Sequence, residues 1–249
     1  MFNFFQRKKT EPAVLPIKVD IHCHVVPGVD DGAPTVDVAL ELVKRMKGMG
    51  LTKIIASPHV TQDTFENTAE TLDPALASLR DAVAAAGLDI EIDRSAEYRI
   101  DDFFMQQLKE GNIKLLPDRH ILVENSFIQE PWNLEKTLFD LKVKGYKPIL
   151  AHPERYLYYH QGKMARYKQL HDIGTLFQVN MLSIAGAYGK PEKEIALKLL
   201  DNGYVDFIGT DLHNMRHIEI LEQYLASREY SKIRAKLEAS AKNDERFGG

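Results

Sequence analysis

Short apolar runs alternate along this chain with amphipathic stretches. The apolar runs predict seven β-strands, because each is brief and ends at a polar residue or a turn. They cover Lys18–His24, Leu51–Ser57, Asp89–Glu97, Ile121–Asn125, Pro148–His152, Thr175–Asn180 and Val205–Asp211. Between them, apolar residues recur at helical spacing. The predicted helices include Val36–Met49, Ala69–Ala85, Leu134–Lys144 and Glu192–Asp201.

Repeated strand–helix units predict parallel strands joined by right-handed crossovers. Seven such units favour a closed, TIM-like (β/α)7 barrel over an open sheet, so we predict the α/β fold class. No low-complexity linker interrupts the pattern, so residues 18–249 are predicted to form a single domain. Residues 1–17 are predicted to be a tail, and Tyr230–Arg246 a charged surface helix that frays at its end.

Ionisable side chains gather at the carboxyl ends of the predicted strands, where barrels of this kind have their active sites. A histidine or a carboxylate stands at six of the seven ends. His22 and His24 share one face of the first strand, and Cys23 points to the other face. The candidate set is His22, His24, Asp31, His59, Glu97, Glu124, His152, Asp211 and His213.

This set predicts a metal site. One histidine at a strand end is more often a hydrogen-bonded core residue, but packing does not explain six ionisable strand ends on one rim. Burying so many ionisable groups together is costly unless they coordinate cations. Nine side chains are too many for one ion and fit two or three. Mixed nitrogen and oxygen ligands suit Mn, Fe or Zn, and the carboxylates favour Mn or Fe. Glu97 is a candidate to bridge two ions.

Neighbouring metal ions lower the pKa of a shared water and stabilise an oxyanion, which suits hydrolysis of a phosphate ester. Arg155 follows the His152 loop and is a candidate to bind phosphate through its fork of donors. Arg99 and Arg216 are weaker candidates for the same role, and each arginine could instead form a surface ion pair. The remaining histidines are predicted to be surface or structural residues: His120, His160, His171 and His217.

Composition and charge also limit the partners and the location that we expect for the protein. A net charge of −4 argues against nucleic acid as the main partner. No apolar run approaches the roughly 20 residues that span a bilayer. The single cysteine allows no internal disulfide, which suits a reducing cytosol. The segment Met1–Thr10 is apolar and then basic, so we expect a loose tail or transient contact with an anionic membrane surface.

Other hydrolytic signatures are missing from the sequence. A cysteine phosphatase needs an arginine six residues after its nucleophile, but Val29 stands six residues after Cys23. The sequence has neither a Walker-type glycine loop nor a Gly-x-Ser-x-Gly elbow.

Two strings carry a family resemblance: Pro-Gly-Val-Asp-Asp-Gly at 27–32 and Ala-His-Pro-Glu-Arg-Tyr at 151–156. With Asp20–His24, Ser57–His59 and Asp211–Asn214, they make residues 18 to 225 similar to the PHP family, named for polymerase and histidinol phosphatase. Within that family the chain resembles the bacterial manganese-dependent protein-tyrosine phosphatases of capsular and exopolysaccharide operons.

The resemblance implies a distorted barrel, the PHP fold, with three metal ions in its cleft, manganese first. It implies that His22, His24, Glu97, Glu124, His152 and Asp211 hold the two closer ions, and that Asp31, His59 and His213 hold the third. It implies that Arg155 binds phosphate and that Asp211 or His213 assists proton transfer. The implied substrate is the phosphorylated, tyrosine-rich tail of a membrane-associated tyrosine kinase. The implied location is cytoplasmic, with peripheral contact at the inner face of the membrane.

Two alternatives stay open. One is a small-molecule phosphatase of the same family, acting for example on histidinol phosphate. The other is a non-catalytic, metal-binding regulatory partner, although such a protein has no need for an intact set of nine ligands. The residues after Glu124 are Asn125 and Ser126, where we associate an apolar residue and proline with some relatives, so the wall of the cleft is expected to differ there.

Overall fold

The computed structural model describes residues 14–161 and 164–248. Nine strands form two sheets in which all neighbours pair in parallel. The three-stranded sheet has the order β1 (Val19–Asp20), β2 (Lys53–Ala56) and β4 (Glu91–Arg94). The six-stranded sheet has the order β3 (His59–Val60), β5 (Glu97–Arg99), β6 (His120–Glu124), β7 (Lys147–Ala151), β8 (Leu176–Asn180) and β9 (Phe207–Gly209).

All seven predicted strand regions contain a strand, and two further short strands lie at or beyond predicted ends. β3 follows the second region after Ser57-Pro58, where proline has no N–H to donate to the ladder. The third region contains β4 and ends at Glu97, which is the first residue of β5, after a gap at Ser95-Ala96. At each gap the chain passes from the smaller sheet to the larger one, and the sequence pattern does not indicate this change of sheet.

The last strand region returns to the first, so the parallel sheet is curled. Cys23 forms a parallel bridge with Leu212. The backbone N–H of Asp211 donates to the carbonyl of His22 at 2.7 Å, and that of His24 donates to the carbonyl of Leu212 at 2.9 Å. The fold is therefore mixed α/β with a curled parallel sheet.

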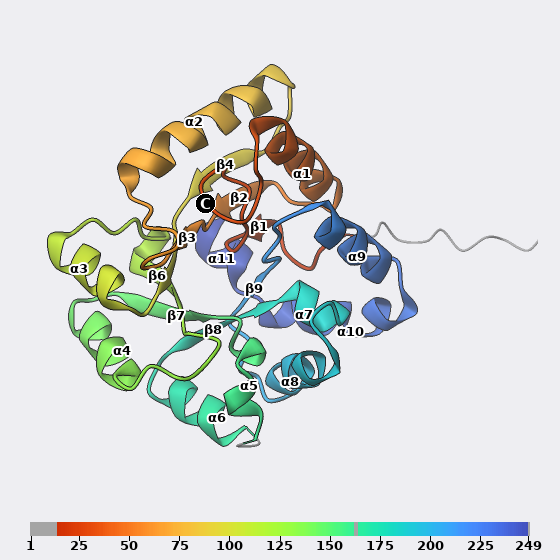
Figure 1. Ribbon diagram of the computed structural model, residues 1–249. Helices are drawn as coiled ribbons and strands as arrows, with labels where there is room; N and C mark the ends of the chain where they lie inside the picture. Colours follow the sequence, from red (N-terminus) through yellow and green to blue (C-terminus); the bar gives the residue numbers. More distant parts are fainter. Residues whose placement is uncertain (1–13, 162–163, 249) are drawn as a thin grey trace, which may run out of the picture.

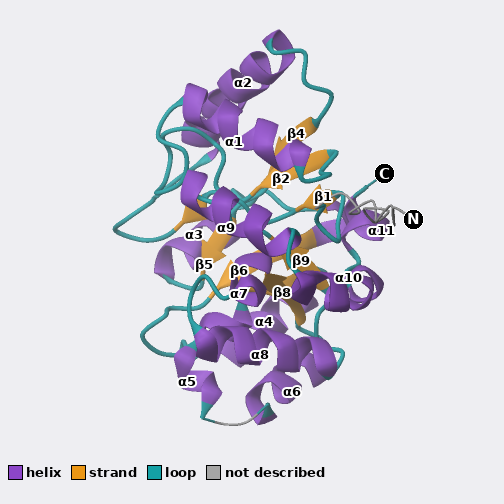
Figure 2. Cartoon of the chain, turned by 90° about the vertical axis from the view of Figure 1, so that its right-hand side faces the viewer, coloured by secondary structure: helices purple, strands orange, loops and turns teal. Residues whose placement is uncertain are grey.

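Helices surround the sheets (Figures 1 and 2). The four predicted helices are present as α1 (Val36–Gly48), α2 (Ala69–Ala85), α4 (Leu134–Val143) and α8 (Lys190–Asp201). The other α-helices are α3 (Asp102–Glu110), α5 (Leu157–His160), α6 (Ala165–Asp172), α7 (Met181–Ala185), α9 (Met215–Leu225), α10 (Arg228–Ser240) and α11 (Asn243–Phe247). Two 3-10 turns, η1 (Pro117–Arg119) and η2 (Pro153–Arg155), precede β6 and follow β7. Every helix in the described part of the chain is too short or too polar to cross a membrane.

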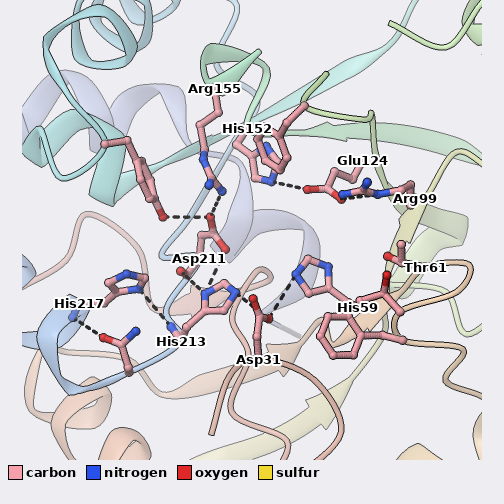
Figure 3. Close-up of a pocket in the computed structure, with 15 residues that line it drawn as sticks. Asp31, His59, Thr61, Arg99, Glu124, His152, Arg155, Asp211, His213 and His217 are labelled. Atoms are coloured by element: carbon pink, nitrogen blue, oxygen red, sulfur yellow. Dashed lines mark hydrogen bonds and ion pairs between the residues drawn. The ribbon is translucent and has the colours of Figure 1, made fainter. Parts of the chain in front are cut away.

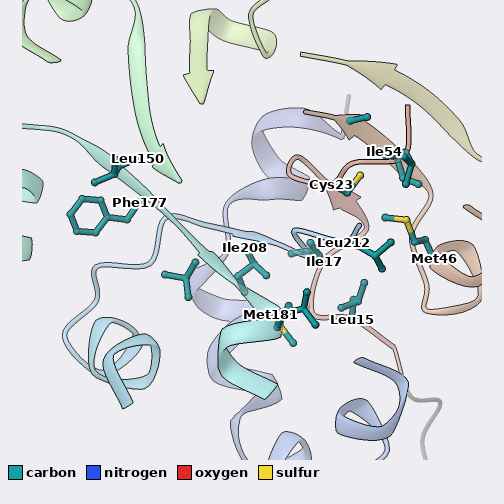
Figure 4. Packing of buried hydrophobic residues seen from close by; sticks show 14 of the residues in the cluster. Leu15, Ile17, Cys23, Met46, Ile54, Leu150, Phe177, Met181, Ile208 and Leu212 are labelled. Carbon is teal, nitrogen blue, oxygen red and sulfur yellow. The ribbon is translucent and has the colours of Figure 1, made fainter. Parts of the chain in front are cut away.

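The core lies between the helices and the strands. Cys23 lies in this core near Met46, Ile54 and Leu212 (Figure 4), whereas His22 and His24 belong to the groups of possible metal ligands. The predicted tail ends too late, because Leu15 and Ile17 are also buried in this core. Residues 1–13 of the predicted tail lie outside the described residues. The local sequence does not reveal this boundary, since the partners of the segment are distant in the chain: the N–H of Leu15 donates to Met49.

The C-terminal segment is not the single surface helix that its charge pattern predicts. It breaks into α10 and α11. Asn243, at the start of α11, is fully buried, and its side chain bonds the backbone of both β1 and β9: it donates to the carbonyls of Val19 and Ile208 and accepts from the N–H of Ile208. Phe247 is buried beneath the sheet. These contacts with distant residues, and not the local charge pattern, determine the structure of the C-terminal segment.

Candidate metal centre

A cleft of about 400 Å³ opens at the carboxyl ends of the strands (Figure 3). The structure brings all nine predicted ligand residues to this place. Six of them line the cleft: Asp31, His59, Glu124, His152, Asp211 and His213. The other three, His22, His24 and Glu97, are buried.

The ligand atoms form overlapping groups, in each of which all atoms lie within 4.8 Å of one another. The groups are His24, Asp31, His59 and His213; His22, Glu97 and His152; His22, His24 and Asp211; and His59, Glu97 and Glu124. Because His22, His24, His59 and Glu97 each belong to two groups, the possible ion positions are adjacent and share ligands. Glu97 lies in two of these groups, as a carboxylate that bridges two ions would, and its bridging role remains a prediction.

Hydrogen bonds fix which nitrogen of three histidines faces the cluster. The Nδ1 of His22 lies 2.6 Å from Oε1 of Gln178, and the Nδ1 of His24 lies 2.8 Å from Oδ2 of Asp30. The Nδ1 of His213 lies 2.9 Å from the carbonyl oxygen of Asp211. Each partner atom only accepts, so each Nδ1 carries a hydrogen and donates it, as in histidines that bind metals through Nε2.

The inward-facing atoms need a cation. Nε2 of His22, Nε2 of His24 and Oε2 of Glu97 are buried and have no hydrogen-bond partner in the described chain. Oε2 of Glu97 lies 3.3 Å from Nε2 of His22 and 3.6 Å from that of His24. When Nδ1 of each imidazole carries the hydrogen, Nε2 presents a lone pair, and it faces a lone pair of the Glu97 carboxylate. Only a proton or a metal ion between these atoms removes the repulsion. A donor set of imidazoles and carboxylates without thiolate fits divalent cations such as Mn²⁺, Fe²⁺ or Zn²⁺.

The pKa shifts of the clustered side chains also favour the binding of cations. Burial opposes a charge on His22, but the carboxylates of Glu97 and Asp211 outweigh it and raise the pKa of His22 to about 9. In the same way, burial opposes a charge on His59, but Glu97 and its neighbours raise the pKa of His59 to about 10. Burial and the nearby Glu97 raise the pKa of Glu124 to about 7. The negative potential that holds protons here also attracts metal cations.

The backbone is specialised at the same place. His152 and Asp211 adopt left-handed conformations, with φ of 31° and 52°, which non-glycine residues adopt at a cost when the surroundings enforce it. A Cβ on Gly32 would lie 2.1 Å from the carbonyl oxygen of His24. A Cβ on Gly209 would lie 2.6 Å from both Cβ of His22 and Nε2 of Gln178. These glycines allow the ligand segments to approach one another closely.

Arg155 is held over the cleft by three contacts. Its Nη1 donates to Oδ2 of Asp211 at 2.7 Å. Its guanidinium lies 4.7 Å from the ring centre of Phe127 and 4.1 Å from that of Tyr188, as cation–π contacts. The hydroxyl of Tyr188 also donates to Asp211. Burial opposes the charge on Arg155, but Asp211 outweighs it and raises the pKa of the guanidinium.

The other two predicted arginines differ from each other. Arg99 lines the cleft and donates to Oε2 of Glu124 through Nε and Nη2. The prediction for Arg216 is wrong: this residue is exposed on α9, outside the lining that the described residues form. Helical phase explains the difference, because His217, the next residue on α9, lines the cleft instead.

Histidines outside the predicted set are mostly structural, as expected. His120 bonds Pro117, His160 bonds Glu154 and His171 pairs with Asp206. His217 corrects the prediction, because it lines the cleft and its Nδ1 accepts from the backbone N–H of His213.

The residues that support the ligands are not apparent from the sequence. Asp30 and Asp31 are neighbours in the same acidic loop. The sequence indicates a ligand in this loop but does not show which of the two carboxylates binds the metal and which supports a ligand. Gln178 and Asn180 lie on β8, and Asn180 donates to Oδ2 of Asp211 at 2.6 Å. An amide at a strand end gives no metal-ligand signal by itself.

Comparison with known proteins extends these observations. Residues 18–238 match the family model described as capsular polysaccharide synthesis, CpsB/CapC. The tyrosine-protein phosphatase YwqE of Bacillus subtilis is 30% identical over 199 residues, which cover 80% of this chain and 78% of that protein. CapC of Staphylococcus aureus is 28% identical over 227 residues, which cover 90% and 89%.

Solved structures give the same grouping. A structure from work on YwqE of B. subtilis and CpsB of Streptococcus pneumoniae, described as unique metal-dependent tyrosine phosphatases, matches with a TM-score of 0.74 and 26% identity. The match covers 90% of this chain and 95% of that one. An amidohydrolase from Mycoplasma synoviae, at 12% identity and a TM-score of 0.59, shares the fold alone.

Proposed function

The chain belongs to the CpsB/CapC family of capsular polysaccharide synthesis, and on this premise we propose that it is a metal-dependent hydrolase of phosphotyrosine in proteins. The observation that carries the proposal is the convergence of nine imidazole and carboxylate side chains at one cleft, with buried lone pairs facing one another. The similarity to YwqE, a tyrosine-protein phosphatase, supports phosphotyrosine as the substrate group.

We propose that two or three divalent ions bind here, with manganese the first candidate and iron or zinc the alternatives. His22, His24, Glu97, Glu124, His152 and Asp211 would hold two ions, and Asp31, His59 and His213 would hold the third. Such ions supply an activated water and offset the charge of the phosphoryl oxygens.

The side chains of the protein prepare the cleft for a phosphate. Arg155 is fixed by Asp211 and by two aromatic rings, and the remaining N–H groups of its guanidinium have no partner in the described chain, so they are available to phosphate oxygens. Arg99, which keeps part of its surface in the cleft, is a second proposed phosphate contact.

Proton transfer to the leaving group is proposed for His213 or Asp211. The Nδ1 hydrogen of His213 is engaged by the carbonyl of Asp211, so Nε2 is the atom that would either hold the third ion or exchange a proton, but not both at once. A tyrosine phenolate, whose ordinary pKa is about 10, needs less protonation than an alkoxide does.

We further propose that the curled sheets form one distorted (β/α)7 barrel of the PHP type, and that residues 18–249, extended back to Val14, are a single domain. The proposed substrate is the phosphorylated tail of a membrane-associated tyrosine kinase. This places the proposed activity in the cytoplasm, close to the membrane.

The test uses metal-free protein restored with Mn²⁺, Fe²⁺ or Zn²⁺ in turn and given phosphotyrosine peptides and histidinol phosphate side by side. We expect hydrolysis of the peptides with Mn²⁺ and its loss in His152→Ala, with a circular dichroism spectrum like that of the wild type. A strong preference for histidinol phosphate would contradict the proposed substrate. Inactivity with every metal would contradict the proposed hydrolysis.

A further inference from the structure

A groove continues from the cleft along its wall. Its volume is about 310 Å³. Three pairs of consecutive residues join the two hollows, because one member of each pair lines the cleft and the other lines the groove: Thr61–Gln62, Arg99–Ile100 and Ser126–Phe127. A chain with one residue in the cleft therefore has a continuous path into the groove.

The lining of the groove is partly apolar and partly acidic. Ile100, Met105 and Trp132 give it apolar surface. Asp101 and Asp102 give it two carboxylates. The carboxylate of Asp101 accepts hydrogen bonds from backbone N–H groups, whereas Asp102 is exposed at the start of α3. Such a surface suits an apolar side chain that stands beside a basic one.

Trp132 is left uncovered by the described chain. It is 94% exposed, and Ile128 in the same loop is 89% exposed. All the large hydrophobic side chains that are exposed in the described chain lie between residues 127 and 173, in the sector that includes this loop and α4. Exposed aromatic side chains gathered beside a cleft mark a binding surface. The two carboxylates disfavour an anionic membrane as the occupant, since they would repel it.

We propose that this groove binds the part of the substrate chain next to the phosphotyrosine, and that it selects an apolar residue beside a lysine or arginine. The inference rests on the proposed function, because it is the phosphate in the cleft that brings the flanking residues to the groove. Trp132 is then a specificity-determining residue, and the phosphate is held without its help.

Trp132 is also the only tryptophan of the chain, so its fluorescence reports on the groove directly. The probes are two peptides with the same non-hydrolysable phosphonate analogue of phosphotyrosine, one flanked by Leu and Lys and the other by two serines. We expect the Leu–Lys peptide to shift the emission of Trp132 to shorter wavelength and to bind about tenfold more tightly, the effect of one well-packed side chain. Equal binding of the two peptides, with no change in emission, would overturn the proposal.

Kinetics of the metal-loaded enzyme give a second test. Trp132→Ala should raise KM about tenfold for the Leu–Lys phosphotyrosine peptide and leave kcat unchanged, as expected when a single interface anchor is truncated. Hydrolysis of p-nitrophenyl phosphate, which does not reach the groove, should be unchanged. Phe139→Ala is the matched control, because Phe139 is a 62% exposed aromatic residue of α4 outside the groove lining.

The outcomes separate this inference from the proposed function. A fluorescence shift without hydrolysis of any phosphate ester would support the groove and overturn the phosphatase. Hydrolysis of both peptides with equal KM, or equal effects of Trp132→Ala and Phe139→Ala, would overturn the groove and leave the phosphatase intact. Asp102→Asn should remove the preference for lysine over serine, and an unchanged preference would overturn the basic part of the selection.

Discussion

Nδ1 of His22 donates a hydrogen bond to Oε1 of Gln178 at 2.6 Å, and this contact turns the free nitrogen of His22 towards the cluster. The two residues come from the first and the sixth of the seven predicted strand regions, 156 positions apart. Gly209 makes room for them, because any side chain there would collide with both. A hydrogen bond from the far nitrogen of the ring is what orients a histidine that binds a metal.

Gln178→Leu should therefore weaken metal binding. Without its acceptor, His22 can exchange the hydrogen between its two ring nitrogens, and affinity for the metal should fall by about 10- to 100-fold. Isothermal titration of the metal-free protein with Mn²⁺ measures the change. Gln106→Leu, at an exposed position of α3, is the control and should bind as the wild type does. Equal affinity in the two variants would contradict a role for Gln178.

Arg155→Ala should weaken engagement of the phosphate. The loss of a charged hydrogen-bond donor, about 1.5–3 kcal/mol, corresponds to a fall of about 10- to 100-fold in kcat/KM. Arg155→Lys should recover only part of this, because lysine keeps the charge but loses the planar fork and the stacking between Phe127 and Tyr188. Steady-state kinetics with p-nitrophenyl phosphate measures the effect.

The arginine that lies outside the cleft provides the comparison. Arg216→Ala should leave kcat/KM unchanged, because the side chain is exposed on α9. If Arg155→Ala and Arg216→Ala behaved alike, the phosphate contact would be assigned to the wrong residue.

The sequence predicts most of the ligand set and little of its support. Apart from Asp31, which stands in the first loop, the ligands end or follow the predicted apolar strands, so local pattern and strand parity place them at the rim; His22 and His24 are the clearest case. Gln178 and Asn180 act through residues far away in the chain, His22 and Asp211, and Asp30 acts on His24 through the folding of its own loop. Their side chains have ordinary polar identities, and only the packed structure shows what they bond.

The same limit applies to the ends of the chain. Leu15 and Ile17 are buried by distant partners, and Asn243 bonds β1 and β9. The periodicity of apolar residues indicates where a helix or strand forms, but it gives no information about such long-range contacts. β3 and β5, which follow Ser57-Pro58 and Ser95-Ala96, are only 2 and 3 residues long, so neither gives a strand pattern of its own in the sequence.

Asn243→Ala should destabilise the protein by about 2–3 kcal/mol, because it leaves buried backbone groups of Val19 and Ile208 without partners. Urea denaturation followed by circular dichroism measures the free energy of unfolding. Glu245→Ala, an exposed change in the same helix, should alter it little. A result for Asn243→Ala as small as that control would mean that α11 does not hold the two strands together.

His120 predicts a dependence of stability on pH. It is buried against Phe207 and Phe247, and this burial lowers its pKa below the ordinary value of 6.5. Between the lowered pKa and 6.5 the unfolded chain binds more protons than the folded protein, so the free energy of unfolding rises with pH through this window and is level above it.

The measurement compares metal-free wild type and His120→Gln by urea denaturation at pH 7.5 and pH 5.5. The wild type should lose more stability on acidification than the variant, because only the wild type carries this titrating group. Equal losses would show that His120 titrates alike in the folded and unfolded states.

The most direct test of the account is anomalous X-ray diffraction at the manganese edge from crystals grown with Mn²⁺. We predict two or three peaks inside the cleft, each surrounded by atoms of the nine side chains and with Glu97 beside more than one of them. Manganese found only at surface carboxylates, with no peak between His22, Glu97 and His152, would contradict the metal centre and the hydrolytic function built on it.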